Sequence, residues 1–243
     1  MDNLGAILLA GTLAGLAKGG LGPLGAVITP IMILAMPPEA EKQAVGFVLL
    51  MLIVGDWFAL YVYWGRWDRQ RTRPLLLGAV VGIAIGATLL AGLSSEAVRR
   101  LVGVVGLFLA GYTLVQDRLA GLGYQPRTWH GVLSGGAAGF TSSLANAGGP
   151  PFNAYMLLQN VDPRTFVATA TLFFAVVNMI KLPFFLWNGA LRFDLVPSAL
   201  PGMALVPVGV WVGKQVVEHI NRRVFNGIVW IGLVISSIVL LYQ

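Results

Sequence analysis

Apolar segments separated by short charged linkers fill most of this 243-residue chain. Each of the uninterrupted segments has about the 20 residues that an α-helix needs to cross the apolar core of a bilayer. Proline, serine, aspartate or asparagine stands at or near the start of each one, as is typical of helix N-termini. These segments are residues 42–64, 74–93, 97–116, 164–188, 196–217 and 222–242. The pattern therefore predicts an all-α polytopic membrane protein.

Two further apolar segments, residues 4–36 and 129–160, are interrupted in the middle by small and polar residues. The first breaks at residues 18–23 (Lys-Gly-Gly-Leu-Gly-Pro) and the second at residues 141–149. A single helix of about 33 residues would be about 50 Å long, whereas the apolar core of a bilayer is about 30 Å thick. Each block must therefore fold back or stagger. Irregular backbone at membrane depth is tolerated where it lines a polar cavity, so the two breaks predict a binding site.

The two halves of the chain match each other along their length. A displacement of 124 positions places Gly11 on Gly135 and Gly25 on Gly149, and the matches continue through the later segments. Such collinear matches favour an internal duplication. We therefore expect two homologous repeats, residues 1–120 and 121–243, each with one broken block followed by three transmembrane helices.

The broken blocks decide how the two repeats are oriented. If each block crosses the membrane once, the repeats are parallel with four crossings each, and the 14 basic residues other than Lys18 and Lys181 divide seven to seven. If each block is a re-entrant hairpin, the repeats are inverted and the division is ten to four. Positive residues favour the cytoplasmic side of a membrane. We therefore prefer the inverted arrangement, with both termini outside and the four-arginine loop of residues 66–73 in the cytoplasm; the parallel arrangement is the alternative.

The composition supports the membrane assignment and narrows the partners. Hydrophobic residues make up 57% of the chain and charged residues 11%, with a mean hydropathy of +0.79, whereas a soluble domain carries about 25% charged residues. The basic excess lies at segment ends, which is typical of membrane orientation rather than of nucleic-acid binding. We expect no cleaved signal peptide, because no basic stretch precedes the first apolar segment. With no cysteine, the chain offers no disulfide or thiol chemistry.

The sequence at the breaks carries a family resemblance. Residues 13–25 read Leu-Ala-Gly-Leu-Ala-Lys-Gly-Gly-Leu-Gly-Pro-Leu-Gly and run into Pro-Ile-Met-Ile-Leu at 30–34, and residues 138–151 repeat the pattern up to Gly-Gly-Pro-Pro. Together with its length, duplication and basic loop, the chain resembles the TauE/SafE family, also called the TSUP or sulfite exporter family. The resemblance implies a transporter of the bacterial inner membrane for sulfite, sulfoacetate, thiosulfate or other small sulfur-containing or organic anions. The chain departs from the usual Gly-Gly-Gly run of the family at residues 21–23 and 146–147.

Small polar groups at the two breaks form the candidate anion site. The N–H groups of helices that restart near Leu24 and Gly149 suit an anion, because a helix N-terminus carries a partial positive charge. Lys18 within a membrane is a candidate ligand; the alternative is that the break reaches water and merely solvates it. The neutral donors of the second break have the alternative roles of helix capping and interhelical bonding. The candidate substrate-binding residues are Lys18, Gly19, Gly20, Gly22, Ser142, Ser143, Asn146, Gly148 and Gly149.

Two more charged residues, Asp56 and Lys181, lie inside uninterrupted segments at nearly equivalent positions of the two halves. One hypothesis is a proton-linked or gating ion pair at the repeat interface, assisted by Asn178 one helical turn before Lys181. The alternative is that both side chains snorkel towards the headgroups near Trp57 and Trp187.

We expect no enzymatic activity, cofactor or metal site. The two histidines, His130 and His219, do not stand in a triad or metal-ligand pattern, and no Walker-type phosphate-binding motif is present. The prediction is a secondary transporter that exports sulfite or an organosulfonate such as sulfoacetate, driven by an ion or proton gradient. Its partners would be the anion, the lipid bilayer, H⁺ and, given the glycine-rich helices, a second copy in a homodimer. The alternatives are an anion channel of the same fold and a non-transporting membrane subunit that needs a partner.

Overall fold

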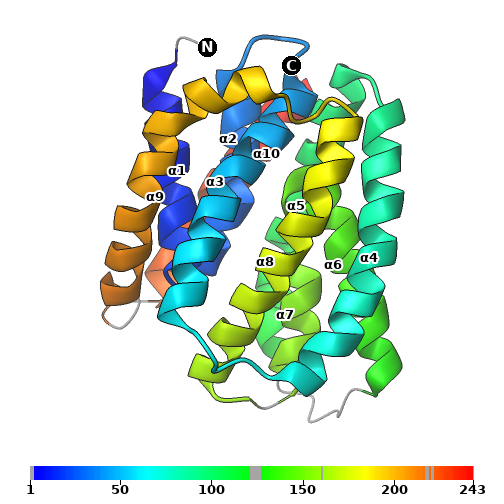
Figure 1. Ribbon diagram of the computed structural model, residues 1–243, viewed down its shortest axis with the longest axis vertical. Helices are drawn as coiled ribbons and strands as arrows, with labels where there is room; N and C mark the ends of the chain where they lie inside the picture. Colours follow the sequence, from blue (N-terminus) through cyan, green and yellow to red (C-terminus); the bar gives the residue numbers. More distant parts are fainter. Residues whose placement is uncertain (1–2, 121–126, 160, 217–218, 220–221, 243) are drawn as a thin grey trace.

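The chain is all-helical over the residues that the structure describes (Figure 1). The computed structural model describes residues 3–120, 127–159, 161–216, 219 and 222–242; the predicted start of the second repeat and the last residue of the second broken block lie outside them. The elements in chain order are α1 (Leu4–Lys18), the 3₁₀ turn η1 (Gly22–Leu24), α2 (Gly25–Ala35), α3 (Glu41–Val62), α4 (Arg69–Gly92), α5 (Ser95–Ala120), α6 (Thr128–Ala145), α7 (Gly149–Leu157), α8 (Pro163–Trp187), the 3₁₀ turn η2 (Phe193–Leu195), α9 (Val196–Val216) and α10 (Arg222–Tyr242). No strand occurs within the described residues.

Each broken block forms a helical hairpin. The start of α1 (Asn3 and Ile7) and the end of α2 (Met32 and Met36) line one shared cavity, so α2 returns to the level at which α1 begins. In the second block, α6 and α7 pack together, and the Ser134 hydroxyl donates a hydrogen bond to a carbonyl of α7. Figure 1 shows that α1 and α2 enter from the end of the bundle where both termini lie, whereas α6 and α7 enter from the opposite end. The two hairpin tips therefore meet near the middle of the bundle.

The residues at the breaks explain why the helices stop there. At the end of α1, the N–H groups of Gly20 and Leu21 bond to the carbonyls of Ala17 and Leu16 at 3.3 and 3.1 Å, which is the Schellman pattern of a helix C-terminus. Gly20 has φ 130°, a backbone conformation that favours glycine. At the end of α6, Asn146 takes the left-handed conformation with φ 54°, which asparagine tolerates better than most residues. The polar breaks are thus local stop signals encoded by the sequence.

The two halves exchange partners in the tertiary structure. The first helix of each hairpin packs on the second long helix of the other half, so that α1 lies on α9 and α6 lies on α4. The long helices cross over in the same way, with α3 on α8 and α9, α4 on α8, and α5 on α10. Each half therefore supplies the walls against which the hairpin of the other half is held.

Glycine makes the hairpin contacts close. A Cβ atom at Gly15 of α1 would lie 2.4 Å from the carbonyl oxygen of Val206 in α9, and one at Gly82 of α4 would lie 2.0 Å from that of Gly136 in α6. Such distances leave no room for a side chain, so the helix backbones touch, as in membrane helix pairs with small residues four apart. The glycine-rich faces that suggested a homodimer are thus used inside the bundle.

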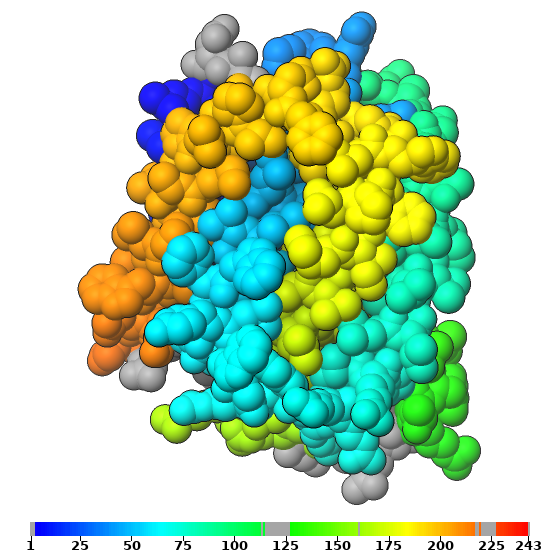
Figure 2. Space-filling view, in the orientation of Figure 1, coloured from blue at the N-terminus to red at the C-terminus, as the bar shows by residue number. Residues whose placement is uncertain are grey.

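Four helices are long and apolar enough to cross a membrane within the described part of the chain: α3, α4, α8, and η2 with α9. Large apolar side chains on their outer faces are exposed, among them Trp57, Tyr61, Leu77 and Trp211. Figure 2 shows the side chains of α9, α3 and α8 packed side by side over one such face. An apolar exterior around a bundle with buried polar side chains is the arrangement that a lipid environment favours.

Candidate anion-binding site

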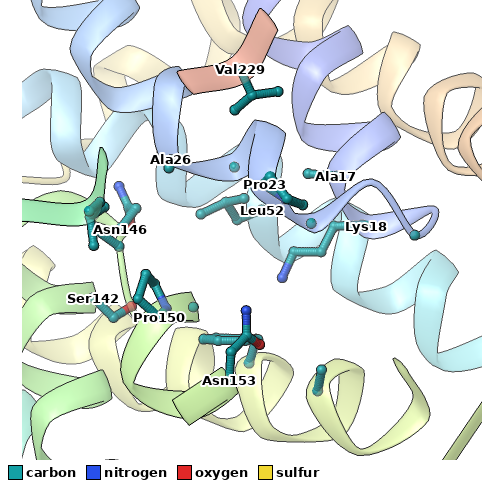
Figure 3. Close-up of a pocket in the computed structure, with 18 of the residues that line it drawn as sticks. Ala17, Lys18, Pro23, Ala26, Leu52, Ser142, Asn146, Pro150, Asn153 and Val229 are labelled. Atoms are coloured by element: carbon teal, nitrogen blue, oxygen red, sulfur yellow. The ribbon is translucent and has the colours of Figure 1, made fainter. Parts of the chain in front are cut away.

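A cavity of about 300 Å³ lies where the two hairpin tips meet. Both tips contribute to it, with Lys18 and Gly22 from the first and Ser142, Asn146 and Gly149 from the second (Figure 3). Its other walls come from the first two thirds of α8, the middle of α10 and the second half of α5. The cavity therefore extends from the middle of the bundle towards the end at which α8 begins, which also carries the four-arginine loop. The residues that line it are Ala17, Lys18, Gly20, Gly22, Pro23, Gly25, Ala26, Leu52, Leu109, Tyr112, Ser142, Asn146, Ala147, Gly149, Pro150, Asn153, Phe166, Val167, Ala170, Thr171, Phe174, Asn178, Val229, Trp230 and Leu233.

Lys18 forms an ion pair at the edge of this cavity. Its ammonium group pairs with the carboxylate of Asp56 in α3, whose second oxygen accepts a hydrogen bond from Asn178 Nδ2 of α8 at 2.7 Å. The Lys18 ammonium also lies 5.5 Å from the centre of the Phe174 ring. The Lys18 side chain is 13% exposed and that of Asp56 4%. The pair thus joins a hairpin tip to two long helices from different halves of the chain, and only its cationic member lines the cavity.

A second ammonium group, that of Lys181 in α8, lies on the other side of the second hairpin tip. It donates to Asn146 Oδ1 at 2.6 Å and to Ser142 Oγ at 3.2 Å, and it is 0% exposed. The Asn146 amide nitrogen in turn donates to the Thr29 hydroxyl at 3.2 Å and to the Val45 carbonyl at 3.0 Å. One asparagine side chain therefore ties the second hairpin tip to α8, α2 and α3.

This polar cluster carries an excess of positive charge. Two ammonium groups and one carboxylate give it a formal charge of +1, and Lys181 contacts neutral oxygens and the face of the Phe185 ring rather than a carboxylate. A buried charge costs several kcal/mol unless it is compensated. Ser142 accepts from Lys181, so its own O–H remains a donor. A monoanion in the cavity would compensate the charge and accept hydrogen bonds from these groups.

Further donors face the cavity without being used elsewhere. The Asn153 amide of α7 makes no hydrogen bond with the described residues, and Figure 3 shows it pointing towards Lys18 across the cavity. The helices α2 and α7 begin at the cavity wall, at Gly25 and Gly149. Their N-termini add partial positive charge there. The site is therefore suited to an anion by its charge, by its donors and by its helix dipoles.

The structure divides the residues that the sequence singled out. The residues that line the cavity are Lys18, Gly20, Gly22, Ser142, Asn146, Gly149 and Asn178. Three others pack elsewhere: a Cβ atom at Gly19 would meet α9, Gly148 packs against Ala138 and Phe174, and the Ser143 hydroxyl faces the Ile83 carbonyl of α4 at 3.5 Å. Because α6 is buried on several sides, consecutive residues at its end face different neighbours.

Two interpretations of the charges inside the spans need correction. Asp56 is 3% and Lys181 0% exposed, so neither side chain snorkels to the membrane surface. Asp56 pairs with Lys18 rather than with Lys181. The physical reason is that α8 faces Asp56 with Asn178, whereas Lys181, three residues later, faces Ser142 and Asn146 of the second hairpin tip.

Several residues of the site were not singled out by the sequence, and two of them are threonines. Thr29 holds Asn146, and Thr171 of α8 lines the cavity. In the sequence, each of these threonines is a hydroxyl residue in an apolar segment. Their positions did not indicate a site, because such hydroxyls commonly donate to a carbonyl of their own helix. Thr141 does so, donating to the Ala137 carbonyl at 2.8 Å.

The chain was compared with known proteins. A family model described as "Sulfite exporter TauE/SafE" matches residues 7–240, nearly the whole chain. No curated protein and no solved structure matches it.

Proposed function

Because the chain belongs to the TauE/SafE sulfite exporter family, whose members are membrane transporters of anions, we propose that it is a secondary transporter with sulfite or an organosulfonate such as sulfoacetate as substrate. The observation that carries the proposal is the cavity between the hairpin tips, where Lys18 and several neutral donors converge. An anion that leaves water must replace its hydration shell with such groups, since an unpaired charge at membrane depth is costly.

In this proposal Lys18 is the principal ligand. Its ammonium group faces the cavity while it remains paired with Asp56, so an incoming anion competes with the carboxylate for the same cation. Ser142, Asn153 and the N-termini of α2 and α7 supply the remaining donors. The cluster carries a formal charge of +1, and a bound anion offsets this positive charge, which favours anions over cations and neutral solutes.

The transport cycle that we propose rests on an inverted repeat. The two hairpins enter from opposite ends of the bundle (Figure 1) and each packs on the other half, with α1 on α9 and α6 on α4. Opposite entry is what a two-fold axis in the membrane plane would produce. The six long helices would then cross the membrane, and the four-arginine loop would face the cytoplasm of a bacterial inner membrane. Movement of one repeat against the other would expose the site to each side in turn, and a proton or other ion gradient would drive export.

The test is anion flux in proteoliposomes. Purified protein is reconstituted and the flux of labelled sulfite is measured against a panel of sulfonates and carboxylates, with and without a pH gradient. We expect saturable flux of sulfite or a sulfonate that changes with the gradient and is lost in Lys18→Ala. Lys214→Ala, which removes an exposed positive charge at the end of α9, is the matched control and should transport like the unmodified protein.

The other outcomes separate the alternatives. Flux that does not saturate at millimolar anion and ignores the gradient would indicate a channel of the same fold. A well-folded protein that moves no anion of the panel would overturn the proposal and favour a membrane subunit that needs a partner. Equal flux in the two lysine variants would remove Lys18 from the site.

A further inference from the structure

The two hairpin tips lie in different environments. At the first tip, Gly22 and Pro23 are exposed and line the cavity. At the second tip, Ser142 and Ala147 reach the cavity wall but are only 3% and 4% exposed. The first tip is thus open to the outside, whereas the second tip meets the cavity with one side only and is otherwise packed.

Comparison of equivalent positions in the two halves shows which side of the bundle is closed. The displacement of 124 residues that relates the halves places Gly22 on Asn146 and Thr29 on Asn153. Gly22 and Asn153 both line the open cavity. The positions equivalent to this pair are Asn146 and Thr29, and their side chains are in contact. Asn146 Nδ2 donates to Thr29 Oγ1 at 3.2 Å and to the α3 backbone at 3.0 Å. The structure is therefore open on the side of the four-arginine loop and closed on the other by the amide of Asn146.

The two lysine contacts are counterparts in the same sense. Lys18 and Ser142 occupy equivalent positions at the ends of α1 and α6, and each contacts a charged residue on the first long helix of its own half: Asp56 on α3 and Lys181 on α8. The first contact borders the open cavity, whereas Lys181 lies behind the closed tip and is 0% exposed. Its hydrogen-bond partners are neutral oxygens and its ammonium group lies 5.1 Å from the centre of the Phe185 ring, so no carboxylate among the described residues pairs with it.

We propose that Lys181 forms a second anion-binding position behind Ser142 and Asn146, which separate it from the open cavity. This position is closed in this structure and opens towards the end of the bundle opposite the four-arginine loop. This inference rests on the proposed function and deepens it. Its ligand is the same small anion that binds at Lys18. The opening step breaks the contacts of Asn146 with Thr29 and the Val45 carbonyl, and it frees Lys181 Nζ to exchange the Asn146 oxygen for an oxygen of the anion.

The geometry joins the two positions through α8. Asn178 holds Asp56, the partner of Lys18, and Lys181 follows one helical turn later on the same helix. A shift of α8 relative to the hairpins therefore acts on both lysines together. The anion would be received by Lys18 on one side of the membrane and released from Lys181 on the other, or the reverse.

The absence of cysteine from the chain permits a direct test by single cysteines. Thr29→Cys probes the closed side and Asn153→Cys the open cavity, while Ser94→Cys and Gln70→Cys mark the two ends of the bundle on the exposed surface. A membrane-impermeant thiol reagent is added to oriented proteoliposomes with and without a transported sulfonate on both sides, because sulfite itself consumes thiol reagents. We expect Thr29→Cys to react only from the side at which Ser94→Cys reacts, and at least about threefold faster when the anion drives the cycle; Asn153→Cys should react from the Gln70→Cys side.

The charge of Lys181 is tested by chemical rescue. Lys181→Cys should lower anion flux at least about tenfold, because a charge-assisted contact is lost. Treatment during sulfonate turnover with 2-aminoethyl methanethiosulfonate, which places an ammonium group on the thiol through a disulfide, should return at least about half of the flux, whereas the neutral methyl reagent should not. A sulfonate is used because sulfite would cleave this disulfide. A merely structural lysine would not show this dependence on the added charge.

The inference and the proposed function fail in different ways. If the cysteine-free protein itself moves no anion, the proposed function fails. If it transports and depends on Lys18, but Thr29→Cys reacts from neither side or from the Gln70→Cys side, the second position is overturned. Unchanged flux in Lys181→Cys would also overturn it, and the Thr29→Cys measurement decides the question if the Lys181 variant does not fold.

Discussion

The ammonium group of Lys181 and the side-chain oxygen of Asn146 lie 2.6 Å apart, and the same asparagine holds Thr29 and the Val45 carbonyl with its amide nitrogen. Asn146 thus satisfies its donors and its acceptor with partners on three helices. It does so from a left-handed backbone position at the end of α6. A single residue both ends a helix and fastens the second hairpin tip to the rest of the bundle.

Replacement of Asn146 by Ala should destabilise the protein by about 3 kcal/mol, since it removes hydrogen bonds and leaves a buried ammonium group with one neutral partner. Thermal unfolding in detergent measures the effect. Asn153→Ala is the matched control, because the Asn153 amide faces the cavity without a partner among the described residues, and it should change stability by no more than about 0.5 kcal/mol. Equal effects of the two variants would contradict the fastening role of Asn146.

The pair of Lys18 and Asp56 should show strong energetic coupling. Removal of one partner leaves a charge in a largely buried place, so Lys18→Met and Asp56→Asn should each cost about 3 kcal/mol. The double variant should be more stable than the sum of the single effects predicts, by about 1–3 kcal/mol. Denaturant unfolding of the four proteins gives this coupling energy, and a value near zero would show that the ion pair contributes nothing to the fold.

Because α1 packs closely on α9, even the addition of a methyl group at their contact should lower the stability of the protein. Gly15→Ala places a Cβ atom 2.4 Å from a backbone carbonyl oxygen, so the helices must separate and stability should fall by about 1–3 kcal/mol. In Gly111→Ala, on α5, the added carbon meets nothing within 4 Å, and we expect no loss of stability. Similar melting temperatures for both variants would argue against the backbone contact.

The acid stability of the protein should depend on Asp68, the N-cap of α4. Partial burial raises the pKa of this carboxyl. Hydrogen bonds from the Arg71 backbone N–H, at 2.9 Å, and from the Arg71 guanidinium lower the pKa by more than burial raises it, so that it lies below the ordinary 3.8. Because the folded-state pKa is lowered, the stabilisation is complete above pH of about 4 and is lost as the pH falls through the folded-state value.

Asp68→Asn should therefore lower stability at pH 7 by about 1 kcal/mol, and the difference from the unmodified protein should shrink below pH of about 4. Melting temperatures between pH 7 and pH 3 check this. Asp194→Asn, in an ion pair whose members are 59% exposed, serves as the control and should have no measurable effect. If the stability difference between Asp68→Asn and the unmodified protein grew as the pH fell, the pKa of Asp68 would not be lowered by folding.

Sequence patterns alone located the elements and the two breaks. Apolar segments of bilayer length and the small residues that interrupt two of them are properties of the local chain, and the helices follow from them: α3 begins at Glu41 against a predicted start at 42, and α8 at Pro163 against 164. Arg69–Gly92 begins five residues before the predicted span at 74, because Asp68 caps the helix N-terminal to Pro74.

The tertiary structure decided which polar side chains meet. Lys18 and Asp56 are 38 residues apart, and Asn178 and Asp56 are 122 apart, so these contacts depend on how far each hairpin enters and how each helix is rotated. Neither the depth of a hairpin nor the rotation of a helix leaves a periodic signal in the sequence. Both depend on which partner helix each glycine-rich face packs against, and the sequence does not name that partner. The chain by itself therefore determined that a polar site lies at the two breaks, while only the packing of one half on the other decided that Lys18 faces the cavity and Lys181 is closed off behind Asn146.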